Sequence, residues 1–238
     1  MGNDNGVWIM HGRAADDPRC LHTPEELLRY IDEVGFLPLF KNEIPGFSAE
    51  EQVESAYWWT GDERKDPWEW RKLLARSGKV AYGKFFDHKA GFISLGWLPA
   101  FVNYRRDGYD FDALWEDEKA SFRQKKVMDL FDDETELFSY EVKEKAGFGK
   151  GGEKNFEGIL TALQQELYLC VRDFRQKQNK KGEPYGWGIA VLCKPEHLWG
   201  YGQVASGYRE DPAASKERIY ARMRELYPGV SEKQLKKI

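Results

Sequence analysis

The sequence predicts a mostly helical α+β protein. Helix-capping residues recur along the chain, short strand candidates interrupt the helices, and two apolar strand candidates flank a polar segment near residue 180. The 238 residues are 41% hydrophobic and 15% aromatic, enough to bury a sizeable core although 32% are charged. This composition argues against an intrinsically disordered chain.

In the first part of the chain, a capping Thr, Ser or Asp followed three residues later by Glu marks each helix start. Thr23 opens a helix whose apolar residues have helical spacing and which ends at Gly35. Ser48 opens a short acidic helix. Asp66 opens a third helix, which stops at Gly78.

The pattern is less distinct over residues 79–106. We expect a fourth helix over 81–87 and a fifth over 97–104. Between them, 89–96 contains two glycines and an Ile-Ser-Leu core, so it forms a loop or a short strand.

From residue 107 the pattern becomes more specific. Ser121 caps a helix that continues to Phe131, and 134–138 is a short strand candidate. Ser139 caps the next helix. The glycine-rich segment 147–152 forms a turn, since it lacks the Gly-Lys-Ser/Thr ending of a phosphate loop.

A long helix then carries Phe156 and Leu167 at the ends of one apolar face. A strand over 168–174, a polar tip over 175–185 and a strand over 187–193 follow. This order is that of a winged helix-turn-helix, in which the third helix is offered to the DNA major groove and the hairpin, or wing, contacts the backbone.

The remaining residues add two helices rich in Arg and Lys, over 212–227 and 231–238. The fold class is therefore α+β, with tandem winged helix-turn-helix modules. We divide the chain into an N-terminal helical, winged-helix-like region at 1–106, a winged helix-turn-helix at 107–200 with its wing at 168–193, and a C-terminal helical segment at 201–238.

Several classes of protein are excluded. No stretch is long and apolar enough for a membrane span, and the first ten residues do not resemble a signal peptide, so we expect a soluble cytoplasmic protein without membrane association. Three scattered cysteines and four isolated histidines predict no disulfide framework and no metal site. No cofactor is predicted, because the chain has no dinucleotide-binding or phosphate-loop motif. Cys170 and Cys193 lie near each other if the hairpin is symmetric.

The net charge of −4 conceals an alternation of sign along the chain. Residues 1–60 carry −7, 61–106 carry +5, 107–137 carry −7 and 138–238 carry +5. A basic face can therefore exist on a net acidic protein, although solvated helix faces explain these charges equally well.

The wing is the best candidate for contact with nucleic acid. Its cations suit phosphate contacts, which position a protein without reading base sequence. Lys150, Lys154 and Asn155, around the preceding turn, extend this surface. The five cations of the wing are Arg172, Arg175, Lys177, Lys180 and Lys181.

The helix before the wing is a weaker candidate for contacts that recognise base sequence. We expect its outward side to offer Thr161, Gln164 and Gln165, together with several glutamates and no arginine. The winged helix could therefore serve only as a packing scaffold.

An aromatic cluster with neighbouring carboxylates forms a second candidate site. Aromatic faces can stack on a flipped base, and a carboxylate can activate water. The alternative is that these rings build a core or a domain joint. The aromatic pocket candidates are Tyr57, Trp58, Trp59, Trp68 and Trp70, with Asp62, Asp66 and Glu69 among them.

Several segments resemble the winged-helix proteins grouped with the bacterial alkylpurine DNA glycosylases AlkZ and YcaQ, and most closely the shorter AlkZ-related proteins. The resemblance covers about residues 23–200 and implies tandem winged helices. The segments that carry it are 31–37, 58–62, 66–71, 79–86, 91–104 and 121–195.

The resemblance also implies where catalytic residues would lie. Those glycosylases use a Gln-hydrophobic-Asp or Gln-hydrophobic-Gln motif just after a Gly-Tyr/Phe-Val step. The equivalent step here is 35–37, and the two polar positions of the motif are occupied by Pro38 and Phe40. Neither side chain can stabilise an oxocarbenium-like transition state. Glu43 is the nearest substitute in the chain.

We therefore expect a DNA-binding protein related to alkylpurine DNA glycosylases that lacks base excision by the family mechanism. One alternative is an active glycosylase or hydrolase that uses a relocated carboxylate, at Glu43, Asp62, Asp66 or Glu69. The other is a non-enzymatic scaffold whose acidic segments meet a protein partner.

Overall fold

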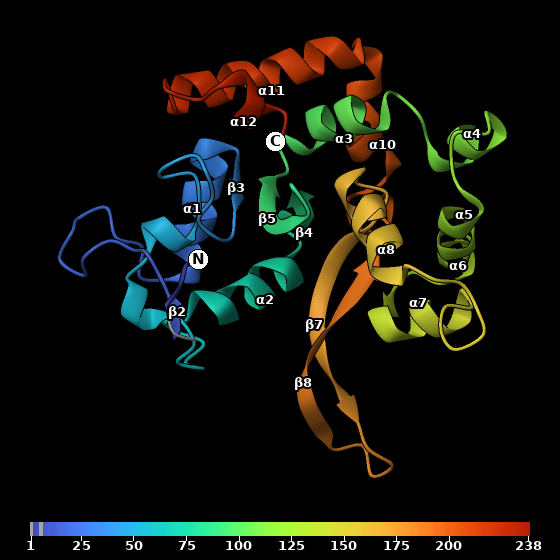
Figure 1. Cartoon of the computed structure of the whole chain (residues 1–238), viewed down its shortest axis with the longest axis horizontal. Coiled ribbons are helices and arrows are strands. Elements are labelled where there is room, and N and C mark those ends of the chain that lie inside the picture. The colour runs from blue at the N-terminus through green and yellow to red at the C-terminus, as the bar shows by residue number, and fades with distance from the viewer. Residues whose placement is uncertain (1, 5–6) are drawn as a thin grey trace. The chain divides into compact units, whose positions relative to one another are not determined.

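The computed structural model describes residues 2–4 and 7–238 and has an α+β fold (Figure 1), so the predicted fold class is confirmed at this level. The chain divides into two compact units. The first contains Met1–Leu98 and Lys216–Ile238, and the second contains Pro99–Ser215. The three-part division at residues 106 and 200 stays a prediction.

The capping residues of the first unit start and end helices as the sequence indicates. Helix α1 (Pro24–Val34) begins after Thr23, whose side chain accepts a hydrogen bond from the Glu26 amide, and ends at Gly35 with a φ of 99°. Helix α2 (Pro67–Ser77) begins after Asp66 and ends at Gly78, which has left-handed geometry. Local capping chemistry therefore suffices to predict both helices.

The acidic helix expected after Ser48 is only a turn. Ser48 Oγ accepts from the Glu51 amide at 3.2 Å, but the N-cap position is Ala49, and η1 (Glu50–Gln52) is a 3-10 helix that ends where Val53 becomes extended. A second 3-10 turn, η2 (Ser55–Tyr57), follows. Strands β1 (Gly2–Asp4) and β2 (Val7–Ile9) pair antiparallel at the start of the chain.

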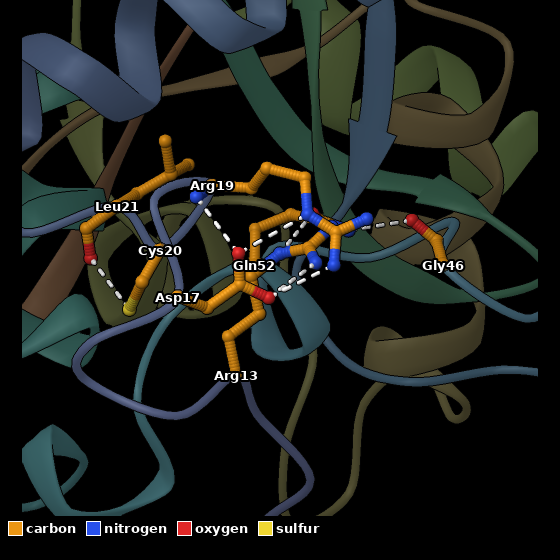
Figure 2. A network of polar contacts seen from close by, with 7 residues as sticks. All are labelled: Arg13, Asp17, Arg19, Cys20, Leu21, Gly46 and Gln52. Carbon is orange, nitrogen blue, oxygen red and sulfur yellow. Dashed lines mark hydrogen bonds and ion pairs between the residues drawn. The ribbon is translucent and has the colours of Figure 1, made fainter.

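A polar network ties the segment after β2 to these turns (Figure 2). Arg13 donates from Nε and Nη2 to Gln52 Oε1, at 3.2 and 2.8 Å, and isolated bridges join Arg13 to Glu54 and Leu21 to Val53. Asp17 lies between two guanidinium groups, and its hydrogen bonds to Arg19 above all hold its pKa well below the usual range. The network fixes residues 13–21 on the first unit.

The sheet of the first unit corrects one sequence prediction. The helix expected over 81–87 is wrong, because Val80–Phe86 forms strand β4 and pairs antiparallel with β5 (Lys89–Ser94). Residues 89–96, expected as a loop or a short strand, contain β5. A third strand, β3 (Phe36–Pro38), pairs with the other edge of β5, giving the order β3-β5-β4. Aromatic residues from both faces of β4 are buried, so tertiary packing selects the strand.

The second unit follows the predicted order of helices, strand and hairpin. Ser121 forms a capping box with Gln124, and Ser139 is the first residue of its helix rather than its cap. The helix α4 was not expected from the sequence. The elements are α3 (Leu98–Arg106), α4 (Phe111–Glu116), α5 (Phe122–Met128), α6 (Leu130–Asp133), β6 (Leu137–Phe138), α7 (Ser139–Lys145), α8 (Phe156–Gln165), β7 (Cys170–Gln178) and β8 (Pro184–Cys193).

Strands β6, β8 and β7 form an antiparallel sheet in that order. After it come α9 (Pro195–Trp199), α10 (Tyr201–Val204), η3 (Ala205–Arg209), α11 (Pro212–Leu226) and α12 (Glu232–Leu235). Two helices were expected near α11 and α12, and both are present. Within residues 2–4 and 7–238, no helix has the length and apolar character that crossing a membrane requires.

Candidate nucleic-acid interface

The β7–β8 hairpin changes character along its length. At its base Cys170 is paired with Cys193, and both side chains are buried. From Gln176 to Trp187 most residues are exposed, and this half extends beyond the helices of its own unit (Figure 1). The hairpin is therefore anchored in the core at one end and open to solvent at the other.

The two cysteines at the base are free thiols that face each other. Their Sγ atoms lie 3.6 Å apart, as hairpin symmetry predicts. Contact with Cys193 and burial raise the pKa of the Cys170 thiol well above its usual value. A neutral buried thiol packs as a small apolar group, so this pair stabilises the base of the wing.

The tip of the hairpin is an ordered turn that carries two exposed lysines. Asn179 Oδ1 accepts hydrogen bonds from the amides of Lys181 and Glu183, at 2.8 and 3.1 Å, and its Nδ2 donates to Glu183 Oε2 at 2.8 Å. Gly182 completes the turn with a φ of 80°. The side chains of Lys180 and Lys181 are exposed there. The tip therefore presents two ammonium groups from a fixed backbone.

The other three wing cations lie in different environments. Arg175 Nη1 and Nη2 bind the Glu136 carboxylate at 2.5 and 3.2 Å, and its Nε binds Asp173 at 2.8 Å. These bonds, led by the one to Glu136, raise the pKa of Arg175. Lys177 Nζ lies 4.2 Å from the centroid of the Tyr140 ring, and Arg172 is half-buried. Arg175 is thus part of the hairpin's internal structure and Lys177 packs on Tyr140, whereas Lys180 and Lys181 are exposed.

Lysines of α7 and of the turn that follows it lie beside the hairpin. Lys143 and Lys150 line a surface hollow of about 360 Å³ together with Tyr140. Because Tyr140 also contacts Lys177, the hollow is continuous with the hairpin. Lys154 and Asn155 are exposed at the start of α8. Four of the predicted cationic positions, Lys150, Lys177, Lys180 and Lys181, thus belong to the wing or to the hollow beside it.

The outward side of α8 is not the one expected. Thr161 and Gln164 are buried, at 7% and 3% exposure, and Gln164 Nε2 donates to Leu160 O at 3.2 Å. They face the core because they share the helix face of Leu160 and Leu163. At the turn before α8, Glu153 is held by Arg123 at 2.9 Å and Lys126 at 3.4 Å, and these cations lower its pKa. The helix surface therefore offers few groups that could read base edges.

In the first unit, Phe40 packs into a cluster of tryptophan rings. Its centroid lies 5.4 Å from that of Trp58, 6.3 Å from Trp59 and 6.2 Å from Trp68. Trp59 has an unusual φ of 67° and remains 44% exposed. Phe40 is nearly parallel to Trp59 and Trp68 and tilted against Trp58, and these separations leave no room for a base between Phe40 and the indole rings.

The remaining aromatic candidates lie around or beneath this cluster. Trp70 is fully buried, so it belongs to the core rather than to an accessible pocket. The Arg71 guanidinium lies 3.4 Å from the Trp68 ring centroid, and burial lowers the pKa of Arg71. Tyr57 is half-buried, with its ring 6.3 Å from that of His22.

The positions that correspond to the motif are embedded in apolar structure. Pro38 is buried in β3 and pairs with Gly91 of β5. Beside it and Phe40 lies a small cavity of about 70 Å³. Two carboxylates line this cavity, and both face Lys237: Glu43 at 2.6 Å and Asp87 at 3.7 Å. The ion pair lowers the pKa of Glu43.

The three other carboxylate candidates are also engaged. Asp62 accepts from the Arg64 amide and guanidinium, bonds that lower its pKa. Asp66 is buried and accepts from the amides of Gly61 and Trp68, at 2.8 and 2.9 Å, and Glu69 pairs with Lys72. Each carboxylate thus has a structural partner.

Two buried polar features escaped the sequence reasoning. Glu50 is fully buried and accepts from the amides of His11 and Lys41, at 3.0 and 2.9 Å, and no sequence pattern marks it. In the second unit, a cavity of about 300 Å³ has buried Arg106 in its wall, bound to Glu196 at 2.5 Å. Most of the acidic residues that line this cavity come from 107–137. The negative charge of that segment is therefore the one sequence feature that points to the cavity.

Comparison with known proteins gives one match. A family model described as AlkZ related matches residues 21–238. No curated protein and no solved structure matches the chain. The match confirms the resemblance expected from the sequence and extends it past residue 200 to the C-terminal helices.

Proposed function

Because the chain belongs to the AlkZ-related family, we propose that it binds DNA through a winged helix and does not excise bases by the motif of the AlkZ glycosylases. The binding surface consists of the hairpin tip, Lys177 and the hollow lined by Lys143 and Lys150.

Both three-stranded sheets support tandem winged helices. In each sheet the first, short strand pairs with the last one, so the orders β3-β5-β4 and β6-β8-β7 are equivalent. In the second unit, β6 precedes α7 and α8, and the β7–β8 hairpin follows them, as the order of a winged helix-turn-helix requires. In the first unit, the turns η1 and η2 stand where a second helix would lie.

The main observation in favour of DNA binding is the exposed tip of the hairpin. Among the described residues, no carboxylate lies within ion-pair distance of Lys180 or Lys181, so neither charge is neutralised within the protein. Phosphate contacts by such lysines release counterions and make affinity depend strongly on salt. Few polar groups on α8 can read bases, so we expect binding that depends little on base sequence.

Pro38 and Phe40, together with the existing contacts of the substitute carboxylates, support the proposal that bases are not excised. Glycosyl transfer needs a carboxylate or an amide near the sugar. The apolar pair cannot supply one, and the four alternative carboxylates already bind a cation or cap a helix. A glycosylase that used one of these carboxylates for catalysis would therefore have to break the contact that the carboxylate already makes.

A binding titration tests the proposal. Affinity for a short fluorescent duplex is measured by anisotropy at several salt concentrations, for the wild type and for Lys180→Glu with Lys181→Glu. We expect the double variant to bind at least about tenfold more weakly, with a salt slope smaller by about 2. The matched control is Lys233→Glu with Lys236→Glu, which makes the same charge change at exposed positions of the C-terminal segment.

Three results would overturn all or part of the proposal. Failure of the wild type to bind any duplex at low salt rejects DNA binding and favours the scaffold. An equal loss in the control variant shows that net charge, not the wing, is responsible. Base release from alkylated DNA that one carboxylate-to-alanine change abolishes would reject the second half of the proposal.

A further inference from the structure

One aromatic side chain of the hairpin has almost no contact with the protein. Trp187 is 88% exposed, more than Phe122 at 60% or Tyr201 at 57%. An indole ring buries a large apolar area when it is covered, so a ring exposed to this degree is available to contribute to the binding of a partner.

The backbone is built to expose this ring. Arg175 pairs with Ile189 and Lys177 with Tyr185, so one residue of β7 faces three residues of β8. The strand β8 therefore bulges at 186–188, and bulges of this kind redirect a side chain.

Two glycines and one side-chain hydrogen bond hold the bulge. Gly186 has a φ of 76°, and its carbonyl accepts from Gln176 Nε2 at 2.6 Å. Gly188 lies against Phe174, where an added Cβ would be 3.4 Å from the Phe174 Cβ. Trp187 stands between the two glycines, and its exposure follows from this fixed geometry.

The surroundings of the ring favour a nucleic acid base as the occupant. Tyr185, two residues away, is 51% exposed, and residues 177–185 of the hairpin carry three lysines, at 177, 180 and 181, and one carboxylate, Glu183. Glu183 is turned into the tip by its bond to Asn179. Aromatic faces among cations match the alternation of bases and phosphates in a nucleic acid strand.

We propose that Trp187 stacks on an unpaired base, so that the hairpin prefers nucleic acid with an exposed base face over a fully paired duplex. The proposal rests on the proposed function, because the lysines of the tip must first bring the strand to the wing. In a paired duplex both faces of each base are covered by neighbours, so the indole has a partner only where a base is unstacked.

The test compares two probes of equal length and sequence: a duplex, and the same duplex with one central unpaired base. For the wild type we expect tighter binding of the second probe, and for Trp187→Ala a loss of about tenfold on that probe alone. Trp187→Phe should restore part of the preference. Phe122→Ala removes an exposed aromatic of the same unit and should leave both affinities unchanged.

Fluorescence provides a second readout that a structural defect would not produce. Subtracting the emission of Trp187→Phe from that of the wild type gives the fluorescence of the Trp187 indole. We expect the probe with the unpaired base to quench this fluorescence and the duplex to leave it unchanged.

The outcomes separate the two proposals. If Trp187→Ala changes neither affinity, or both equally, stacking is rejected, while a loss with the tip-lysine variant keeps DNA binding. If the wild type binds neither probe, both proposals fail. Binding of the hairpin to anionic vesicles, with a blue shift of the Trp187 emission and no binding of DNA, would assign the ring to a lipid surface and also reject both.

Discussion

The two units contain sheets of equivalent strand order whose hairpins differ in what they bury. In the first unit, the β4–β5 hairpin turns through Asp87 and His88, whose positive φ values of 46° and 63° suit a two-residue turn. The aromatic residues beside it, Phe85 and Phe86, are 1% and 3% exposed. In the second unit, the two aromatics near the tip of the β7–β8 hairpin, Tyr185 and Trp187, are exposed to solvent.

The two hairpins also differ in length, and this difference sets how much of each one is packed. The first hairpin is packed almost to its end, since Phe85 and Phe86 are buried and only the turn at 87–89 is exposed. The second continues past its own helices, and its last residues can change without affecting the core (Figure 1). With the same strand order, one hairpin is therefore packed up to its turn, whereas the other leaves its tip exposed for the contact that we propose with DNA.

The largest expected effect distinguishes the central strands, β5 and β8. We predict that Gly91→Ala lowers the free energy of unfolding by about 3 kcal/mol, because a Cβ would lie 2.5 Å from Phe86 Cδ2 and 2.8 Å from the Leu37 carbonyl oxygen. Gly188→Ala should change it by less than about 0.5 kcal/mol, since its nearest contact is 3.4 Å. Urea unfolding followed by circular dichroism measures both. Equal losses would mean that the second hairpin is packed as tightly as the first.

Sequence alone predicted those parts of the fold that depend on local chemistry. Thr23 and Asp66 cap their helices because capping needs only residues within one turn. The hairpin at 170–193 was predicted because apolar strands flank a polar tip. The strand at 81–87 could not be predicted in this way, because a short apolar run fits a helix or a strand equally well. Pairing with β5 is what makes it a strand.

For the candidate site, the sequence identified exposed tip residues and failed where a distant contact intervenes. Lys180 and Lys181 lie on the tip, as the hairpin pattern predicts. Arg175 is neutralised by Glu136, 39 residues earlier, which no spacing could reveal. Thr161 and Gln164 were assigned to the wrong face of α8, because a polar residue type does not fix the rotation of a helix against its core.

We expect an effect of intermediate size from a substitution at the base of the second hairpin, and we expect it on stability rather than on DNA affinity. Arg175→Gln removes the cation from Asp173, whose side chain is 6% exposed, and we expect a loss of about 1–2 kcal/mol in the free energy of unfolding. DNA affinity should change less than about twofold, because this charge is already neutralised. Anisotropy and urea unfolding on the same variant give both values. A large loss of affinity with unchanged stability would extend the binding surface down to the base.

The smallest effect concerns surface ion pairs, in which we expect the two units to be alike. Cations lower the pKa of Glu153 in the second unit and of Glu43 in the first from the usual value of 4.5. A lowered pKa in the folded state stabilises the fold above about 4.5, and this contribution is lost as the pH falls through the folded pKa. Glu153→Gln and Glu43→Gln should therefore each destabilise slightly at neutral pH and match the wild type in strong acid. Urea midpoints across this range test it. A clear loss for one variant alone would mean that the units differ in surface electrostatics as well as in the burial of their hairpins.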